Sequence, residues 1–390
     1  MNEAIEELLT RGVQRILPSK KGLADLMAKR KIRLYQGFDP SSAHLHIGNL
    51  IGVRKLAQFQ KLGHKVIFLV GDFTGTIGDP TDKSAARKKM TKEEVLENAR
   101  GWKKQIENVL KFDGANAAEV KYNSEWLAKL SFEEILELAD NFTVQQMIER
   151  DFFQERIKKD LPIRLPEFLY PVMQGYDSIV MGVDLEIGGN DQLFNMLAGR
   201  TLMKALKNKE KFVLTMKLLA DPTGKKMGKT EGNTINLTDK PDDMFGKIMS
   251  LPDSLIEPGT ELLTDLQPEV TANKNPLDSK KALAFEIVKQ IHGRTGAKNA
   301  KKEFERVFQK KDLPSDIPVV LVKEESLPLL DLVFATKAVA SRSEAKRFIL
   351  QGGIDVEEST INDPTQEITI PKEGIVIKVG KIKFVKVKSK

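Results

Sequence analysis

Apolar and polar residues in the first part of the chain follow the order of a strand, a helix and a second strand. Residues 32–35 read as a strand, residues 50–62 carry apolar positions at helical spacing, and residues 65–70 read as the next strand. This order predicts a βαβ unit of an open parallel sheet. In such sheets ligands bind at the carboxyl ends of the strands, so His46 and the loop at 71–75 would lie at that edge.

The central part of the chain is mainly helical in its pattern. Helical spacing covers residues 91–112 and 131–160, a strand is expected at 214–219, and amphipathic helices extend from Pro241 to about Gln309. Three prolines and few periodic apolar residues between Asp312 and Pro328 predict a linker.

The last 60 or so residues are typical of a separate small module. Ser341 and Glu344 form the sequence of a capping box, which predicts a helix that ends at Gln351 before Gly352. Two alternating runs then flank Gly380 and predict a β-hairpin with a type II′ turn.

Composition narrows the class of protein. With 390 residues, 41% hydrophobic and 30% charged, the chain is expected to form two or three globular domains. Its apolar runs are short, its N-terminus lacks the pattern of a secretion signal, and it has no cysteine, so we expect a soluble cytoplasmic protein without a membrane span. A net charge of +7, with six lysines and no acid in residues 378–390, favours a polyanionic partner, although many lysine-rich proteins are basic without one.

Two short signatures suggest nucleotide chemistry. The first is His-Ile-Gly-Asn at residues 46–49, where an imidazole at the mouth of a helix could donate to phosphates. The second is Lys-Met-Gly-Lys-Thr at residues 226–230, where two ammonium groups could hold a leaving pyrophosphate. A loop histidine and a solvated basic turn are the alternative interpretations. A P-loop is excluded, because its first glycine is replaced by Thr223.

A third segment points to an amino-acid pocket. Tyr170, Gln174 and Asp177 lie within two turns on one face of a predicted helix, and residues 188–192 add a glycine-rich polar loop. Buried polar groups need partners, and a small zwitterion with a hydroxyl would provide them. A polar helix face turned to water is the alternative, but the neighbouring Val172 fits it less well.

With these motifs the chain resembles the bacterial tyrosyl-tRNA synthetases, which are class I aminoacyl-tRNA synthetases. The resemblance extends from about Tyr35 to the C-terminus. Within the family, the chain is similar to the short subgroup that ends in an RNA-binding module of the ribosomal S-four type. Four separated runs carry it: residues 35–40, 77–80, 170–177 and 188–192.

The resemblance implies a role for each matching residue. Tyr35 and Asp177 would bind the phenol hydroxyl of tyrosine. The remaining tyrosine-binding residues would be Asp79, Tyr170 and Gln174 at the ammonium, with Asp39 and Gln192 nearby. The ATP-binding residues would be Ser41, His46, Gly48, Asn49, Asp191, Lys226 and Lys229. The catalytic set would be His46, Asn49, Lys83, Arg87, Lys226, Lys229 and Thr230, and tRNA would contact Arg342, Lys346 and Arg347.

The implied fold is α/β, with three domains. A Rossmann-type parallel-sheet catalytic domain would cover residues 1–235, with a helical insertion near 110–165. An α-helical anticodon-binding domain would follow at 236–312, then a linker at 313–327 and a small α+β RNA-binding domain at 328–390. The implied partners are L-tyrosine, ATP, tRNA(Tyr) and a second copy of the chain. Mg²⁺ would arrive with ATP, without a tightly bound protein-ligated metal.

Two departures from the family pattern are visible. Asn49 replaces a second histidine, and Gly228 replaces a serine, but an amide still donates to phosphate and Thr230 keeps one hydroxyl. Three other classes are weighed against this one: the sister enzyme for tryptophan, a non-catalytic RNA-binding relative, and a nucleotidyltransferase acting on a small acid. Tyr35 with Asp177 argues against the first, and the complete set of pocket residues and lysines argues against the second. The third leaves the C-terminal module unexplained.

Overall fold

The computed structural model describes residues 3–79, 90–220, 234–272, 275–309, 317–357, 359–380 and 383–389. These residues form two compact units, one built from Met1–Asp239 with Pro252–Arg294 and the other from Lys240–Leu251 with Thr295–Lys390. The helices expected as one domain over 236–312 are therefore shared between the two units. None of the helices in the described part of the chain is long and apolar enough to cross a membrane.

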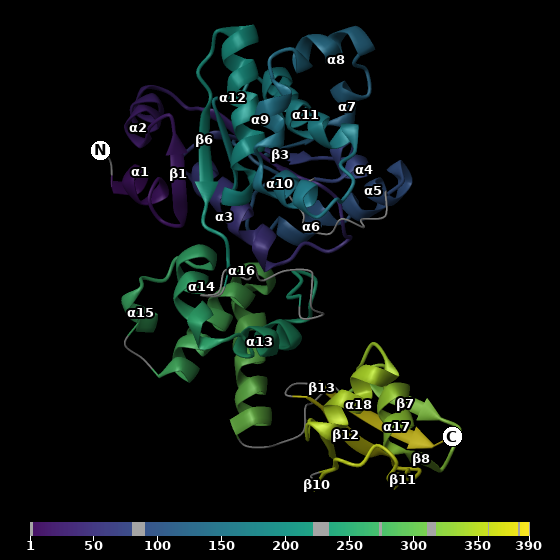
Figure 1. The fold of residues 1–390 in the computed structure, drawn as a ribbon. Helices are drawn as coiled ribbons and strands as arrows, with labels where there is room; N and C mark the ends of the chain where they lie inside the picture. The colour runs from purple at the N-terminus through teal and green to yellow at the C-terminus, as the bar shows by residue number, and fades with distance from the viewer. Residues whose placement is uncertain are drawn as a thin grey trace. The chain divides into compact units, whose positions relative to one another are not determined.

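The first unit is organised around a six-stranded sheet in the order β1-β6-β5-β2-β3-β4. Figure 1 labels β1, β6 and β3 of this sheet. Its strands are β1 (Val13–Leu17), β2 (Arg33–Phe38), β3 (Lys65–Val70), β4 (Glu119–Tyr122), β5 (Leu185–Gly189) and β6 (Phe212–Met216). All neighbours pair in parallel except β1, which pairs antiparallel with β6. The parallel sheet expected from the first seventy residues is confirmed.

The strand order reverses between β2 and β5. From β2 the chain continues to β3 and β4 on one side, whereas β5 and β6 extend the sheet on the other side. Such a switch point leaves a crevice at the carboxyl ends of the two central strands, where ligands of open α/β sheets bind. The residues that follow β2 and β5 therefore lie where a substrate is expected.

Helices connect the strands of this unit. Those before β4 are α1 (Glu3–Leu8), α2 (Lys20–Lys29), α3 (Ile47–Lys61), α4 (Thr74–Ile77), α5 (Lys92–Ala99) and α6 (Trp102–Ile106). Those after it are α7 (Ser124–Leu127), α8 (Phe132–Ala139), α9 (Val144–Ile148), α10 (Asp151–Lys158), α11 (Leu165–Met181), the short η1 (Asn190–Gln192) and α12 (Leu193–Lys207). The helical patterns at 91–112 and 131–160 are thus each broken into shorter helices, since Gly101 and the polar turns between them interrupt the apolar spacing.

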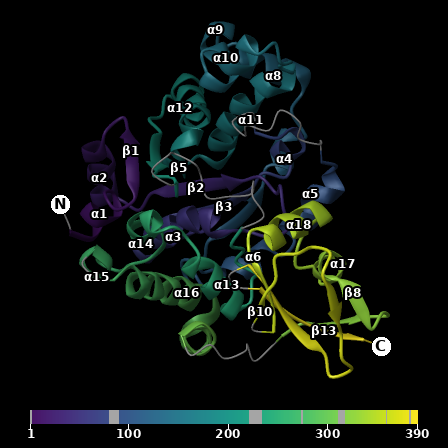
Figure 2. The same ribbon diagram turned by 60° about the horizontal axis from the view of Figure 1, so that its bottom comes forward.

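Three further helical segments complete the first unit: α14 (Ile256–Leu263) after the short η3 (Asp253–Leu255), α15 (Glu269–Ala272) and the first part of α16 (Pro276–Phe304). The helix α14 lies beside α3 (Figures 1 and 2). In α16 the backbone of Gly293 leaves the helical conformation, with φ of 77°, next to the boundary between the two units.

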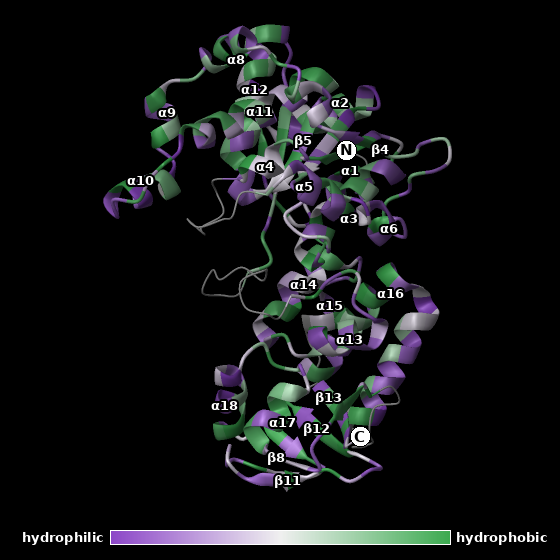
Figure 3. Cartoon of the chain, turned by 90° about the vertical axis from the view of Figure 1, so that its right-hand side faces the viewer, coloured by the Kyte–Doolittle hydropathy of each residue, from purple (hydrophilic) through white to green (hydrophobic). Residues whose placement is uncertain are grey.

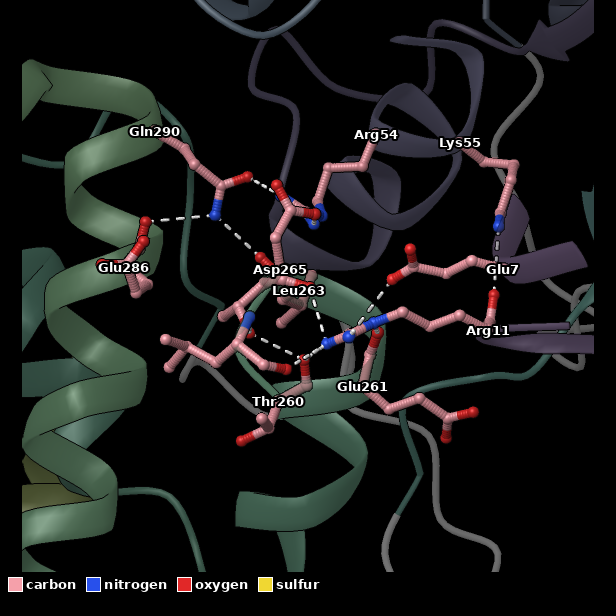
Figure 4. Close-up of polar contacts among 12 residues, drawn as sticks. Glu7, Arg11, Arg54, Lys55, Thr260, Glu261, Leu263, Asp265, Glu286 and Gln290 are labelled. Carbon is pink, nitrogen blue, oxygen red and sulfur yellow. Dashed lines mark hydrogen bonds and ion pairs between the residues drawn. The ribbon is translucent and has the colours of Figure 1, made fainter. Parts of the chain in front are cut away.

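Polar side chains of α3 attach it to the segment after α14, to α16 and to the end of α1 (Figure 4). Arg54 donates to Asp265 at 2.6 Å and to Gln290, and the buried Lys55 donates to the carbonyls of Leu8 and Arg11. Burial lowers the pKa of Lys55 to about 7, with the neighbouring guanidinium groups adding to the effect. A cavity of about 830 Å³ lies beside this cluster, and none of the described residues predicted to bind substrate lines it.

The second unit contains α13 (Pro241–Met249), the end of α16 with η4 (Glu305–Gln309), and a small α+β module. The module has the strands β7 (Val319–Val322), β8 (Ser326–Pro328), β9 (Ile354–Val356), β10 (Ser359–Thr360), β11 (Glu367–Thr369), β12 (Ile375–Val379) and β13 (Lys383–Ser389). Its helices are α17 (Leu329–Ala335) and α18 (Arg342–Leu350), and its buried core includes Leu332, Ile349 and Ile377.

Two of the sequence predictions for this module, those of the linker and of the capping box, differ from the observed local structure. The range expected as a linker contains β7 and β8, and β7 pairs in parallel with β13, a contact that local pattern does not reveal. The expected hairpin is present, with Val379 opposite Lys383, but two of the three residues between them lie outside the described residues. The capping box is modified: Ser341 accepts from the amide of Glu344, whose carboxylate accepts from Ala340 instead of Ser341.

Candidate active site

The carboxylate of Asp39 anchors the site at the end of β2. One oxygen accepts from the Thr74 hydroxyl at 2.7 Å and the other from the Tyr170 hydroxyl at 2.8 Å. A Cβ at Gly71 would lie 2.1 Å from this carboxylate, so the glycine at the end of β3 makes room for it. The predicted residues Asp39 and Tyr170 are thus brought together from segments 131 residues apart.

The helix α11 lines the crevice with Tyr170, Gln174 and Asp177, as their spacing predicted. Burial, reinforced by the charges of Asp39 and Asp79, raises the pKa of Tyr170 well above its usual range. Its hydroxyl therefore stays protonated and acts as a donor to Asp39. Gln174 is half-buried, and its amide NH₂ donates to Glu186 of β5 at 2.9 Å.

Asp177 is held in place by two donors from the segment after β4. Trp126 donates its indole N–H at 2.7 Å, and Asn123 donates its amide at 3.4 Å. Burial raises the pKa of Asp177 well above its usual range, while these two hydrogen bonds oppose that effect. A carboxylate has about four acceptor positions, so Asp177 keeps the capacity to accept from a hydroxyl of a ligand.

Tyr35 of β2 is fully buried in the same region as Asp177. Its hydroxyl is 3.0 Å from the hydroxyl of Ser178 and 3.4 Å from the backbone carbonyl of Gln174. Burial, together with the charges of Glu186 and Asp177, raises the pKa of Tyr35 well above its usual range. Tyr35 and Asp177 therefore occupy one buried region at the centre of the sheet.

A buried ion pair lies in the same region. Lys211, just before β6, pairs with Glu186 on β5, and their side chains are 0% and 2% exposed. Burial lowers the pKa of Lys211, while the charge of Glu186 raises it. Glu186 thus accepts from both Lys211 and Gln174.

Asp79 and Gln192 meet at the mouth of the crevice. The Gln192 amide donates to Asp79, and its oxygen accepts from Asn195 of α12 at 3.0 Å. Asp191 is exposed on η1, after the carboxyl end of β5. All seven residues predicted for tyrosine are therefore described. Six of them form three direct hydrogen bonds, and the seventh, Asp177, lies on α11 with Tyr170 and Gln174.

His46 caps the N-terminus of α3. Its Nδ1 accepts from the amide of Gly48 at 3.1 Å, and the Asn49 side chain accepts from the amide of His46 at 3.0 Å. Because Nδ1 is an acceptor, the neutral ring carries its proton on Nε2, which makes that atom a hydrogen-bond donor. The positive end of the helix dipole favours phosphate at the same place.

The loop before α3 is held by side chains from the region of α5 and α6. Gln105 binds the backbone of Leu45 and Ala43, Trp102 donates to the carbonyl of Ser42, and Asn98 donates to that of Pro40. Ser41, also predicted for ATP, is half-buried in this loop. These clamps fix the segment that would approach the nucleotide.

The chain after the lysine signature returns to His46. The amide of Ile47 donates to Ile235 at 3.0 Å, and the amide of Leu237 donates to Leu45 at 2.7 Å. His46 and Asn236 consequently face each other as an isolated antiparallel bridge. The described residues 235–237, which follow the lysine signature in sequence, therefore lie against the histidine signature.

Five predicted residues lie outside the described part of the chain. They are Lys83, Arg87, Lys226, Lys229 and Thr230. Their roles stay predictions.

The three residues predicted for tRNA are on α18 and are exposed. Arg342 pairs with Asp331 and lies 5.9 Å from the Phe334 ring centroid, while Arg347 is 4.0 Å from Glu344. Such exposed ion pairs contribute little to stability, so these cations can exchange their partners for phosphates.

Sequence reasoning missed the residues that support the pocket: Thr74, Asn123, Trp126, Ser178, Glu186 and Lys211. For Glu186 a signal existed, because a glutamate within the apolar run Leu185–Ile187 is unusual for a buried parallel strand. Thr74 belongs to the loop at 71–75 that the sequence already places at this edge, and Ser178 follows Asp177 on α11. Asn123, Trp126 and Lys211 come from distant segments, and local pattern gives no indication that they meet the pocket.

Comparison with known proteins identifies the family. Residues 27–309 match the family described as tRNA synthetases class I (W and Y). A tyrosine–tRNA ligase of Carboxydothermus hydrogenoformans is 42% identical, with 98% of this chain and 97% of the relative covered. That of Thermotoga maritima is 40% identical, with coverages of 98% and 96%.

Solved structures share the fold. A C-terminally truncated mitochondrial tyrosyl-tRNA synthetase of Aspergillus nidulans has a TM-score of 0.66 at 22% identity, with 79% of this chain and 95% of that chain covered. The corresponding protein of Coccidioides posadasii gives 0.64 at 24%, with coverages of 77% and 92%. The fold and site define a class I aminoacyl-tRNA synthetase. Within that class, the chain belongs to the family of bacterial tyrosine–tRNA ligases.

Proposed function

We propose that the chain activates L-tyrosine with ATP, releases pyrophosphate and transfers tyrosine to the 3′ end of tRNA(Tyr). One observation carries this proposal: buried polar side chains from β2, α11 and the segment after β4 converge at the switch point of the sheet. Family membership supports the same activity. A cytoplasmic location, where ATP and tRNA are present, goes with it.

In this proposal the pocket binds both ends of tyrosine, the phenol hydroxyl and the α-ammonium. Tyr35 and Asp177, the deepest pair, bind the phenol hydroxyl. Tyr170, Gln174 and Asp79 hold the α-ammonium, with Asp39 and Gln192 beside them. The support is chemical, since carboxylate and carbonyl oxygens suit an ammonium and a buried carboxylate suits a hydroxyl donor.

ATP would bind at the N-terminus of α3. His46 donates through Nε2, Asn49 and Ser41 add donors to the phosphates, the backbone of Gly48 supports the adenine, and Asp191 holds the ribose. The pyrophosphate is received by Lys83, Arg87, Lys226, Lys229 and Thr230. The Mg²⁺ that ATP chelates would reduce the charge repulsion between its phosphates.

This set of residues needs no general base. The carboxylate of tyrosine is already ionised near neutral pH, so it attacks the α-phosphorus directly as the bond to pyrophosphate breaks. The protein aligns the reactants and stabilises the charge that moves onto the departing pyrophosphate. A hydroxyl of the terminal ribose of the tRNA then attacks the carbonyl carbon of the adenylate, so that the tyrosyl ester forms as the bond to AMP breaks and AMP is released.

For tRNA we keep the three predicted domains as a proposal: residues 1–235 for catalysis, 236–312 for the anticodon and 328–390 for further RNA contact. Arg342, Lys346 and Arg347 support the last assignment, because long exposed cations bind phosphates.

We also propose a homodimer. Apolar side chains remain exposed on α8, α9 and α11, among them Phe132 at 75%, Val144 at 67% and Leu165 at 79%. Figure 3 shows hydrophobic and hydrophilic bands together on α8, α9 and α10. A group of exposed apolar side chains of this kind marks a surface that another molecule covers. Sedimentation of the wild type and of Phe132→Glu would test it, since an unchanged mass would contradict the assignment.

The test of the activity is amino-acid-dependent exchange of pyrophosphate into ATP, with tyrosine, phenylalanine and tryptophan compared. Exchange with tyrosine alone is expected. Exchange with tryptophan would keep the class and overturn the pocket assignment. A lack of exchange with all three amino acids would overturn the proposed activity.

A further inference from the structure

The ion pair of Glu186 and Lys211 has an unusual position. Both side chains are almost fully buried, at the level of the amino-acid pocket rather than at the surface. Moving an ion pair out of water has a desolvation free energy that offsets much of the attraction between the two charges. Apolar side chains of similar volume often stabilise a fold equally well. Stability alone therefore does not account for this pair.

The contacts of Glu186 indicate what the pair does. One carboxylate oxygen accepts from Lys211, and the other accepts from the amide NH₂ of Gln174 at 2.9 Å. Lys211 also donates to the carbonyl of Met196 at 3.1 Å. Its ammonium fits beside α12 because a Cβ at Gly199 would lie only 2.3 Å from it.

These contacts define which way the Gln174 amide faces. A side-chain amide has a donor end and an acceptor end of almost equal size, so its neighbours decide its orientation. A carboxylate paired with an ammonium is ionised and can only accept. Gln174 must therefore direct NH₂ to Glu186 and its carbonyl oxygen away from it.

We infer that Glu186, held by Lys211, is a positioning residue that fixes the Gln174 carbonyl oxygen toward the α-ammonium of tyrosine. It thereby selects an α-amino acid over a similar acid without the amino group. This inference rests on the proposed function, because it assumes that tyrosine binds with its ammonium at Gln174. Glu186 itself does not touch the substrate.

The test is the nearly isosteric substitution Glu186→Gln, which should reverse the orientation of the Gln174 side-chain amide. In Glu186→Gln, the ammonium of Lys211 still demands an oxygen, so the new amide presents its carbonyl to Lys211 and its NH₂ to Gln174. Gln174 must then turn its own oxygen toward position 186. Its NH₂ now faces the substrate ammonium, and two donors meet.

The readout is equilibrium binding of two ligands, L-tyrosine and 3-(4-hydroxyphenyl)propanoate, which lacks only the amino group. The E186Q variant should bind tyrosine roughly tenfold to a hundredfold more weakly, since a hydrogen bond to a charged group is replaced by a donor–donor contact. Its affinity for the propanoate should stay within about threefold, because that ligand has no ammonium to repel.

A rescue variant separates orientation from general damage. In E186Q combined with Gln174→Glu, the carboxylate at position 174 accepts from the amide at 186 with one oxygen and faces the ammonium with the other. The preference for tyrosine should return. The matched control is Glu210→Gln, the same substitution in the exposed ion pair with Arg200, and it should change neither affinity.

Equal weakening for both ligands in E186Q, or no weakening for tyrosine, would overturn the inference, as would failure of the rescue in a folded protein. If E186Q does not fold, Glu186→Gln with Lys211→Met removes both charges at similar volume. In that double variant the amide is no longer fixed, and a preference equal to the wild type would contradict the inference. Wild-type protein that binds neither ligand would instead refute the proposed function.

Discussion

The pocket and the basic face of α18 use polar side chains in opposite ways. In the pocket, Asp177 and Glu186 are buried, and each accepts hydrogen bonds from two side chains. On α18, Arg342 and Arg347 are 59% and 64% exposed, each with one carboxylate partner within 4.0 Å.

The difference matches the two kinds of ligand that we propose for these regions. A small molecule is recognised by groups whose positions are fixed before it arrives, because a small displacement loses the hydrogen bond. A phosphate backbone is recognised by charge, which tolerates mobile side chains and weakens with salt. Changes in the pocket should therefore alter specificity, and changes on α18 should alter affinity and its salt dependence.

The largest effect is expected for Asp177→Asn. Tyrosyl-tRNA synthetases as a family are the known case in which a site that binds the hydroxyl rejects phenylalanine by about 10⁵. Loss of one hydroxyl partner should reduce this discrimination by about 10² to 10³, as measured by kcat/KM for the two amino acids in pyrophosphate exchange. Unchanged selectivity would remove Asp177 from the hydroxyl site.

Asp177→Asn should also differ from the wild type in how its affinity for tyrosine depends on pH. The raised pKa of Asp177 places its loss of charge at a higher pH than for an ordinary aspartate. The ionised form accepts from the phenol, so wild-type affinity for tyrosine should fall as the pH is lowered through that pKa. Asp177→Asn should lose this dependence.

Lys229→Ala should slow adenylate formation by about 10² to 10³ and leave the tyrosine affinity nearly intact. A single-turnover assay measures the rate, and equilibrium binding measures the affinity. This result would distinguish Lys229 from the pocket residues, because this lysine is proposed to stabilise the charge that develops on the departing pyrophosphate and not the bound tyrosine. A large loss of tyrosine binding would place it in the pocket instead.

Removal of residues 317–390 should spare adenylation and reduce tRNA charging by roughly tenfold to a hundredfold, as several phosphate contacts are lost. The cut belongs before residue 317 and not at 328, since β7 would otherwise lose its partner β13. Aminoacylation at a fixed, stated salt concentration measures the effect. Equal charging by the truncated protein would exclude the module from this step.

Asp184→Asn should lower stability by about 2 kcal/mol near neutral pH. Hydrogen bonds from Arg30 and Lys209 outweigh burial and lower the pKa of Asp184 from 3.8 to about 2. The stabilisation is therefore present above about pH 4 and disappears as the pH falls toward 2. Chemical denaturation at several pH values tests this, with Glu97→Gln in the exposed pair with Arg100 as a control that should change little.

The smallest effect is expected for Arg347→Ala, which should weaken tRNA binding a few-fold and reduce the salt slope by about one unit. Binding measured over a range of salt concentrations tests it. Lys372→Ala, an exposed lysine on the same module but outside α18, is the control. Identical slopes for the two variants would contradict a specific role for α18.

Sequence alone predicted the parts of the fold that depend on local pattern. The strand over 65–70 has the bounds of β3, and the expected helix at 50–62 lies within α3 apart from its last residue. The strand expected at 214–219 occurs instead as β6 at Phe212–Met216, because the buried run begins earlier than its apolar pattern suggests. Spacing on α11 was sufficient to group Tyr170, Gln174 and Asp177.

Contacts between distant segments were not predictable in this way. Residues 185–189 form β5, although the glycines at 188 and 189 favoured a loop. The buried Lys211 resembles any other lysine of a basic chain until β5 and β6 are placed side by side. The segments around His46 and Asn236 are brought together only by the completed sheet.

The attachment of α3 has a mechanical consequence. The imidazole at one end of this helix and the side chains of Arg54 and Lys55 belong to one rod, with about 12 Å between the cap and those side chains along the axis. A helix of this length bends little, so the rod transmits a tilt rather than absorbing it. The position of His46 is consequently linked to the anchorage of Arg54 to Asp265 and Gln290 as well as to the loop that precedes the helix.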